Sequence, residues 1–264
     1  MVPPIIADTK IQTRRLTGLD KVNEYPDEWF YNGFVGGDGL GVKNNLPASQ
    51  HHMIHKSGKG VLMLNCPYGK KGDVLWVRES FLKYKKRHDG KQYFFSYKAG
   101  HSTVRELSYS PTKWKPSIHM PRSACRLFLL NKGVSIERIQ DISEEDCIKE
   151  GIEKVDIPGR ESISDTPYKD KFYKDYLRKN DQENSYMHQS PIESFRTLWN
   201  SIHGQWKWSK KKNAFVCYPW CIEDRPIIPS KYRLERDLIN VTFKSFSNPW
   251  VWAVNFSRIN DYKK

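Results

Sequence analysis

Near the end of the chain, large apolar side chains recur at every second position. Trp250, Trp252, Val254 and Phe256 follow this pattern within residues 250–256. Because successive side chains of a β-strand point to opposite faces, we expect these four residues to share one buried face of a strand. The segment therefore indicates that a sheet forms part of the core.

Four further segments are rich in residues that favour strands. Residues 74–81 and 93–97 are separated by a polar stretch that suits a turn, and we expect the two strands to pair across it. Residues 125–130 and 134–139 flank the sequence Asn-Lys-Gly at residues 131–133, which predicts a hairpin. Together these segments predict that most of the regular structure is β.

Two segments have the spacing of short helices. Ser143 and Asp146 resemble a capping box, and Gly151 suits the end of that helix, which leaves Glu150 at its C-terminal end. A second helix is predicted to begin at Ser190, where a serine can cap and a proline follows. Its apolar face is formed by Phe195, Leu198, Trp199 and Ile202. We expect this face to pack on the core.

Two long stretches show little periodicity and are interpreted as insertions. Residues 33–57 are rich in glycine and asparagine, and residues 153–189 are polar and expected to be partly mobile. With several strands and two short helices, the chain is expected to form an α+β fold that is mainly β. We predict a small β-barrel with short flanking helices and long loop insertions, in a single domain that spans residues 1–264.

The chain of 264 residues carries a formal net charge of +14, and 13% of its residues are aromatic. This combination is typical of proteins that contact phosphates and stack on bases, although a basic solvated surface explains the same charge. No stretch approaches the roughly 18 consecutive apolar residues of a membrane span, and the first residues lack the features of a secretory signal. Five cysteines without a regular framework are typical of reduced thiols. We therefore expect a cytoplasmic protein with no membrane partner.

Two segments far apart in the sequence carry reactive side chains. Lys10, Thr13, Arg14 and Arg15 bring an amine, a hydroxyl and two guanidinium groups within six residues, and Glu150 adds a carboxylate at a predicted helix end. A lysine, a threonine and a glutamate together could form a nucleophilic hydrolase. The residues alone leave open a second interpretation, in which the first segment is an exposed basic strand edge and the glutamate is a solvated helix residue.

Five segments resemble, in the same order, the signature segments of the ASCH domain family. They are residues 5–15, 72–79, 141–146, 195–202 and 248–252. The first is similar to the Gly-x-Lys-x-x-Glu-x-Arg signature, in the threonine-containing variant of phage-borne and bacterial members. The resemblance spans nearly the whole chain apart from the two insertions. Five ordered segments make it more specific than any single segment would be.

The resemblance implies a PUA-like β-barrel and an association with RNA or modified nucleotides. One branch of the family removes the acyl group from N4-acetylcytidine and related N4-acylated cytosines, using a lysine, a threonine and a glutamate. At the matching positions this chain has Lys10, Thr13 and Glu150. It departs from the general signature at Asp8, where the family has glycine, and at Thr13, where the signature has glutamate. Because the amidohydrolase branch carries threonine at the latter position, that departure favours hydrolysis.

The resemblance also implies roles for these residues. Thr13 would be the nucleophile, and a threonine hydroxyl needs a base to take its proton. Lys10 can be that base if burial or the charges of Arg14 and Arg15 lower its pKa, or it can stay charged and stabilise an oxyanion. Glu150 can exchange a proton with the leaving amine, or it can hold the lysine in place as an ion pair. The sequence leaves these alternatives open.

Four residues are candidates for binding the substrate. Arg15 and Arg78 could hold a base carbonyl or a phosphate, and Glu79 could orient an arginine or accept from a base amine. Trp76 could stack on a base. The simpler interpretation is that the three charged residues form ion pairs beside the core and that the tryptophan is a core residue.

Three other motifs suggest ligands but have simpler explanations. The histidines of residues 51–55 together with Cys66 suggest a metal site, but no second pair of ligands lies at a zinc spacing. Cys217 and Cys221 are separated by three residues and so do not form a redox Cys-x-x-Cys pair. Residues 207–212 mix lysines with a tryptophan and could contact nucleic acid, or they could form an ordinary solvated surface. We therefore predict neither a metal nor a cofactor.

The leading prediction is a metal-independent amidohydrolase that acts on an N4-acylated cytosine base or nucleoside through Lys10, Thr13 and Glu150. The alternatives are a noncatalytic module that binds RNA or a modified base in the same pocket, a ribonuclease of the ASCH group, and a phage accessory protein. The expected partners are the N4-acylated base or nucleoside and RNA or another nucleic acid.

Overall fold

The computed structural model of the chain describes residues 2–35, 50–85, 93–100, 113–155, 172–177, 187–229, 232 and 241–260. The fold is mainly β with short helices, as predicted. The helices are α1 (Val2–Ile6), α2 (Glu144–Lys149) and α3 (Pro191–His203). The strands of the central sheet are β1 (Gln12–Arg15), β5 (Val74–Trp76), β8 (Phe128–Arg138) and β15 (Trp250–Ile259). The remaining strands are β2 (Trp29–Val35), β3 (Gln50–His55), β4 (Val61–Asn65), β6 (Phe81–Lys85), β7 (Tyr93–Tyr97), β9 (Lys154–Val155), β10 (Phe172–Lys174), β11 (Met187–His188), β12 (Lys207–Ser209), β13 (Ala214–Cys217) and β14 (Thr242–Ser245).

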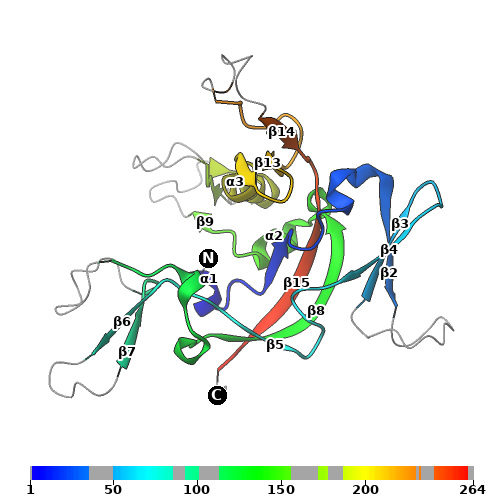
Figure 1. Ribbon diagram of the computed structural model, residues 1–264. Helices are drawn as coiled ribbons and strands as arrows, with labels where there is room; N and C mark the ends of the chain where they lie inside the picture. Colours follow the sequence, from blue (N-terminus) through cyan, green and yellow to red (C-terminus); the bar gives the residue numbers. More distant parts are fainter. Residues whose placement is uncertain are drawn as a thin grey trace, which may run out of the picture.

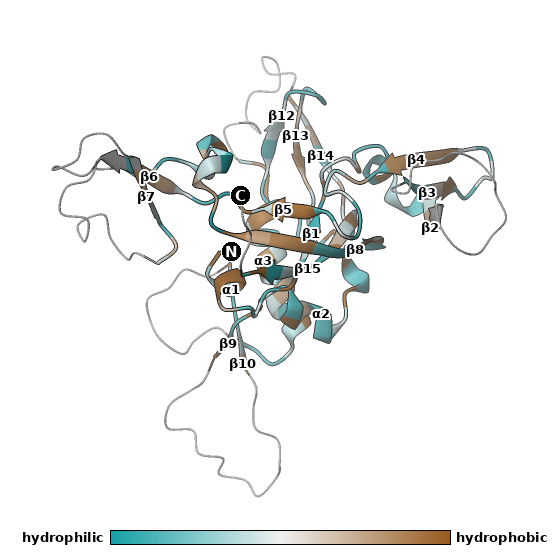
Figure 2. Ribbon diagram, turned by 90° about the horizontal axis from the view of Figure 1, so that it is seen from below, coloured by the Kyte–Doolittle hydropathy of each residue, from teal (hydrophilic) through white to brown (hydrophobic). Residues whose placement is uncertain are grey.

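The central sheet has the strand order β1-β15-β8-β5, and each neighbouring pair is antiparallel. β8 and β15 pair along most of their length, and both curve so that the sheet curls (Figure 1). The β2-β3-β4 sheet and the β6–β7 hairpin extend from opposite ends of this sheet (Figures 1 and 2). Helices α2 and α3 pack against each other beside β1.

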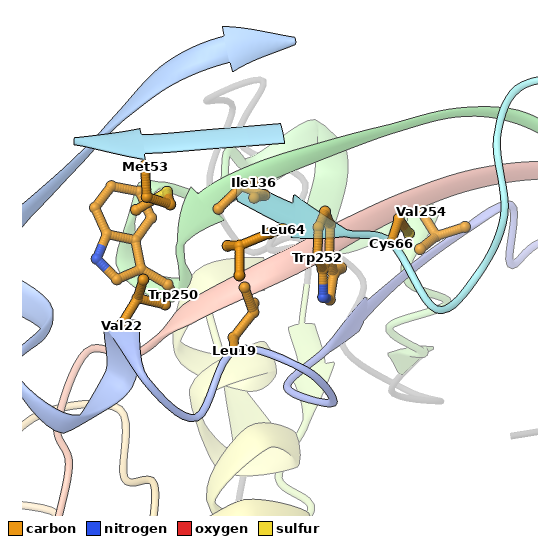
Figure 3. Close-up of a cluster of buried hydrophobic side chains, with 9 residues drawn as sticks. All are labelled: Leu19, Val22, Met53, Leu64, Cys66, Ile136, Trp250, Trp252 and Val254. Atoms are coloured by element: carbon orange, nitrogen blue, oxygen red, sulfur yellow. The ribbon is translucent and has the colours of Figure 1, made fainter. Parts of the chain in front are cut away.

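The two faces of β15 bury different clusters. Trp250, Trp252 and Val254 pack on one face with Ile136 of β8 and with residues of β3 and β4 (Figure 3). Val251 packs on the other face with apolar residues of α2 and α3. The predicted alternation is thus confirmed for the first three of its four residues.

The predicted Asn-Lys-Gly hairpin is wrong. β8 runs through these residues and pairs with β15 on both sides of them. Asn131 lies opposite Phe256 and Gly133 lies opposite Asn255, so Lys132 is an extra residue that forms a bulge. The Asn131 side-chain oxygen accepts a hydrogen bond from the Gly133 amide at 2.9 Å, which stabilises this bulge. Phe256 packs in a smaller cluster with Ile5 and Leu129, next to the cluster of the other three alternating residues, and Leu75 contacts both.

The single strand predicted at residues 74–81 is also wrong. β5 ends at Trp76, and β6 belongs to a separate hairpin with β7. Between the two strands the chain turns and buries Glu79, whose carboxylate bonds to Arg126. Residues 93–97 form a strand as predicted, but β7 pairs with β6, which shares only Phe81 with the predicted partner, and residues 74–76 pair with β8 instead.

Both predicted helices and their caps are confirmed. Ser143 Oγ accepts a hydrogen bond from the Asp146 amide at 3.1 Å, and Ser190 caps α3 in the same manner. Gly151 follows α2 with a φ of +83°, a left-handed conformation that glycine adopts without strain and that ends the helix. Glu150 is therefore the C-cap residue of α2.

The two predicted insertions are partly regular. Residues 50–55 of the first insertion form β3, which pairs with β2 and β4. The described parts of the second insertion form the sheet of β9, β10 and β11. The expected lack of structure is wrong for these parts, because Met53 and Tyr173 supply buried anchors in the core. Residues 36–49 of the first insertion and residues 156–171 and 178–186 of the second lie outside the described residues.

The structure bears on two expectations about the whole chain. Within the described ranges, no helix is both long enough and apolar enough to cross a bilayer. All five cysteines are free thiols, and four of them are buried.

Candidate active site

Lys10 and Glu150 form a buried ion pair between the start of β1 and the end of α2. The Lys10 ammonium donates to Glu150 Oε2 at 2.5 Å and to the Glu150 carbonyl oxygen at 2.5 Å. The two side chains are only 3% and 5% exposed. The backbone holds the pair in register, because the Ile11 amide donates to the Lys149 carbonyl at 2.9 Å. Two residues that are 140 positions apart are thus in direct contact.

Burial makes the Lys10 amine easier to deprotonate. Loss of hydration is the main cause that lowers the pKa of Lys10, and the charges of Arg15 and Arg14 lower it further. The Glu150 carboxylate opposes this shift because it stabilises the ammonium. The pKa remains below that of an exposed lysine, so the neutral amine is more accessible. This is the property that a lysine needs to act as a general base.

Arg14 holds the carboxylates around this pair. Its guanidinium donates to Glu137 Oε1 at 2.6 Å, to Asp146 Oδ2 at 3.3 Å and to Glu150 Oε1 at 3.4 Å. Burial raises the pKa of Glu137, and the charge of Arg14 opposes that rise. Arg14 therefore fixes the position of the second Glu150 oxygen while Lys10 binds the first. Sequence reasoning treated it only as a neighbouring charge.

A pocket opens beside Glu150. It is lined by Arg14, Arg15, Glu150, Phe195, Leu198, Trp199, Ile202 and His203. Its volume is about 280 Å³ including the open mouth. Because this volume includes open solvent at the mouth, the enclosed part is much smaller than a typical small-molecule site. The apolar α3 face that was predicted to pack on the core therefore also forms one wall of a pocket.

His203 lies at the end of α3 in this pocket and is neutral at pH 7. Burial lowers the pKa of His203 to about 4, and the charges of Lys207 and Arg15 add to that effect. Its ring lies against that of Trp199, with the ring centres 4.3 Å apart. The two rings, tilted by 35° to each other, therefore form an uncharged aromatic part of the pocket wall.

Thr13 lies on the other face of β1 from Arg14. Gln12 and Arg14 are buried whereas Thr13 and Arg15 are half-buried, as the alternation of a strand requires. The Thr13 hydroxyl oxygen is buried but has no hydrogen-bond partner among the described residues. Buried hydroxyl groups are seldom left unpaired, because they lose the hydrogen bonds that water supplies in the unfolded chain. Thr13 is not part of the pocket lining, but Arg15 on the same face is.

The other predicted binding residues lie elsewhere. Trp76 belongs to β5, which is the opposite edge of the central sheet from β1. Glu79 is buried, and its two oxygens accept hydrogen bonds from Arg126 at 2.9 and 2.8 Å. Arg78 is exposed, with its guanidinium 5.8 Å from the centre of the Trp76 ring. The structure thus separates these three residues from the predicted catalytic ones.

The histidines of residues 51–55 make local contacts. His51 Nδ1 lies 2.9 Å from the Tyr31 hydroxyl, and His55 Nε2 lies 3.0 Å from a carboxylate oxygen of Glu28. Across the part of the chain that the structure describes, no group of three or more histidine, cysteine, aspartate or glutamate side chains is arranged to hold a metal ion.

Comparisons of the chain with protein-family models, with curated proteins and with solved structures found no match. Inferences about function therefore depend on the geometry of the site and on the resemblance carried by the residues.

Proposed function

We propose that the protein is a metal-independent amidohydrolase that removes the acyl group from N4-acylated cytosine bases or nucleosides. The observation that carries the proposal is the buried Lys10–Glu150 pair beside a pocket. The pair joins an amine of lowered pKa to a carboxylate 2.5 Å away. A proton can move between these two groups while both stay shielded from water, which suits general acid and base catalysis.

Thr13 is the nucleophile in this mechanism. Its hydroxyl oxygen attacks the acyl carbonyl carbon. Because Thr13 and the Lys10–Glu150 pair lie on opposite faces of β1, the mechanism requires this strand to turn so that the hydroxyl proton can pass to the neutral Lys10 amine. The carbon–nitrogen bond then breaks, the exocyclic nitrogen takes a proton from the Lys10–Glu150 pair, and the free cytosine leaves. Water attacks the resulting ester on Thr13, releases the carboxylic acid and restores the hydroxyl.

The surroundings of Thr13 support this role. Its buried hydroxyl makes no hydrogen bond within the described structure, so no existing contact must break before it reacts. Arg15 donates a hydrogen bond to the Arg14 carbonyl at 3.2 Å and has further donors that can stabilise the oxyanion.

The proposal includes the fold. We infer that the curled central sheet, α2 and α3 belong to a PUA-like barrel of the ASCH type. The five segments that resemble this family support the inference, because they fall on or beside β1, β5, α2, α3 and β15. β1 and α2 carry the Lys10–Glu150 pair, and α3 and β15 pack against these two elements.

Turnover of N4-acetylcytidine tests the proposal. In the presence of a chelator, the protein should convert it to cytidine, followed by ultraviolet absorbance. Thr13→Val should lower kcat by about 100-fold or more because it removes the nucleophile. The variant should stay folded, since valine keeps the shape of threonine and the lost hydroxyl has no hydrogen-bond partner in the described structure. Arg78→Ala, at the far edge of the sheet, should leave kcat unchanged.

Three other results would favour a different mechanism or function. A wild-type rate in Thr13→Val would show that water attacks the substrate directly. Binding of N4-acetylcytidine without turnover would contradict the amidohydrolase and favour a noncatalytic modified-base reader. Cleavage of RNA in place of acyl transfer would favour a ribonuclease.

A further inference from the structure

Positive charge is concentrated in about one fifth of the chain. Residues 76–126 contain twelve lysines or arginines and three aspartates or glutamates, a net +9 of the total formal charge of +14. All other residues together account for the remaining +5. Such an uneven distribution indicates a surface that meets an anionic partner.

The described residues of this segment present their cations to solvent. We define the hairpin basic surface as the exposed residues Arg78, Lys98, Lys113, Lys115, Arg122 and Arg126. Among the described residues of the segment, Glu79 is the only carboxylate, and it is 2% exposed. Both of its oxygens are already bonded to Arg126. With Lys83 of β6 counted as well, the described part of the segment has seven exposed cations and no exposed anion.

These cations belong to one packed unit at the base of the β6–β7 hairpin. Lys115 exchanges two backbone hydrogen bonds with Phe81, the first residue of β6, at 3.1 and 2.9 Å. The Lys98 amide donates to the Ser80 carbonyl at 2.9 Å. Phe81 also anchors a small apolar core beneath the surface. The hairpin extends away from the central sheet (Figures 1 and 2).

In the lysine-rich segment of residues 207–212, lysines are paired with exposed carboxylates from other parts of the chain. In residues 207–212, the Lys211 ammonium lies 2.9 Å from a carboxylate oxygen of Asp20, and the Lys212 ammonium lies 3.5 Å from one of Glu24. Neighbouring carboxylates therefore offset part of its charge. The two basic segments, residues 76–126 and 207–212, thus differ in how far carboxylates offset their charge.

We propose that the hairpin basic surface binds the phosphate backbone of a nucleic acid, at a site separate from the pocket beside Glu150. A nucleic acid presents regularly spaced phosphates that several exposed cations can contact together. Arginine side chains bind phosphate with two parallel hydrogen bonds. The Nε and Nη2 groups of Arg126 are already bonded to Glu79, so contact with phosphates falls to the other exposed cations of the surface. Because phosphates are shared by RNA and DNA, both should bind.

An anionic membrane fits this surface less well. Segments that lie in a membrane interface combine cations with large apolar side chains that enter the lipid. Of the large apolar residues that the structure describes as exposed, only Ile118 belongs to residues 76–126. The surface is therefore built for contact with phosphates in water.

The proposal goes beyond hydrolysis of an acylated cytosine. A free nucleoside can enter the pocket without touching the hairpin basic surface, so the two sites can be tested separately. A polymer held there would also bring the enzyme close to bases within a nucleic acid strand.

Fluorescence anisotropy with labelled single-stranded RNA, single-stranded DNA and duplex DNA, at several salt concentrations, tests the proposal. The triple variant Lys113→Glu, Lys115→Glu, Arg122→Glu should bind at least about tenfold more weakly. Loss of three phosphate contacts should make the slope of log affinity against log salt shallower by about 2 for single strands. The matched control is Lys207→Glu, Lys210→Glu, Lys211→Glu, which changes the net charge equally and should bind almost like the wild type.

The same triple variant should hydrolyse N4-acetylcytidine at the wild-type rate if the amidohydrolase proposal holds, so failure of one proposal is distinguishable from failure of the other. The alanine version, Lys113→Ala, Lys115→Ala, Arg122→Ala, should show a smaller loss of affinity and guards against misfolding of the reversed-charge protein. Equal losses in the hairpin and control variants would overturn the proposal, because binding would then depend on net charge alone. Absence of binding to every oligonucleotide, or binding only to anionic vesicles, would also overturn it.

Discussion

Lys10 and Glu150 lose nearly all of their hydration on folding, and each is the main partner of the other. Removing an ion from water costs several kcal/mol, which the attraction within a buried pair only roughly offsets. Such a pair adds little net stability. The lowered pKa of Lys10 instead supports the role of general base proposed above, since such shifts are common at functional sites.

Replacing both residues of the pair should cost less stability than the sum of the two single replacements. Glu150→Ala leaves a buried ammonium without its carboxylate, and it should lower the free energy of unfolding by about 3–5 kcal/mol. Lys10→Met leaves the carboxylate to Arg14 alone and should also be costly. The double variant should lose less than the sum of the two, as measured by urea denaturation of all four proteins. Simple additivity would mean that the pair does not interact in the folded protein.

His203 predicts how stability responds to acid. Burial lowers its pKa from 6.5 in the unfolded chain to about 4 in the folded protein. Below pH 6.5 the unfolded chain binds a proton that the folded protein does not, so stability falls as the pH drops from 6.5 toward 4. This histidine alone should account for about 3 kcal/mol of that loss.

The variant His203→Gln should therefore lose less stability over the same pH range, measured by urea denaturation at several pH values. His51, whose pKa burial also lowers to about 4, is present in both proteins and cancels in the comparison. An equally steep loss in the variant would assign the acid sensitivity to other groups.

At the scale of single elements, local signals predicted the helices better than the strands. The caps at Ser143 and Ser190 depend on amides two or three residues away, so the sequence alone contains the whole interaction. A strand's partner lies far along the chain. The sequence Asn-Lys-Gly has the composition of a turn, but the continuous ladder with β15 outweighs that preference and converts it into a bulge.

The bulge predicts a specific effect at Gly133. Its φ of +155° lies outside the range that other residues adopt readily, although a Cβ there would meet no atom within 4 Å. Gly133→Ala should therefore destabilise the protein by about 1–3 kcal/mol through backbone strain alone. Gly60→Ala is the matched control, because a Cβ at Gly60 meets only an ordinary contact at 3.6 Å. Equal thermal unfolding midpoints for the two variants would contradict this explanation of the bulge.

At the scale of the whole molecule, the site joins residues that no local pattern connects. The resemblance to the ASCH family supplied Lys10 and Glu150 as a pair, and the structure places them in contact. It did not supply Arg14 or the pocket wall of α3, because contacts between a strand and a distant helix face depend on the complete fold. Sequence reasoning also could not separate residues 76–79 from the site, since their distance from β1 follows from the strand order.

The arrangement as a whole places two basic regions in different roles. Arg14 is enclosed by carboxylates and lines the pocket, whereas the described cations of the hairpin basic surface face solvent, and only Arg126 among them is paired with a carboxylate of its own segment, Glu79. A count of net charge cannot distinguish these roles. In the functions proposed above, the region around Arg14 serves catalysis and the hairpin basic surface binds a polyanion. The distinction depends on which cations are paired with carboxylates in the folded protein.

The most direct test of the central claim is the kcat of Glu150→Gln for N4-acetylcytidine, measured beside the wild type with the fold of both checked by circular dichroism. Glutamine keeps the shape of the side chain and an acceptor for Lys10, but it cannot carry the charge or exchange the proton. The account predicts a folded variant whose kcat is lower by about 100-fold or more. Turnover at the wild-type rate would contradict it, because the buried pair would then have no part in the chemistry.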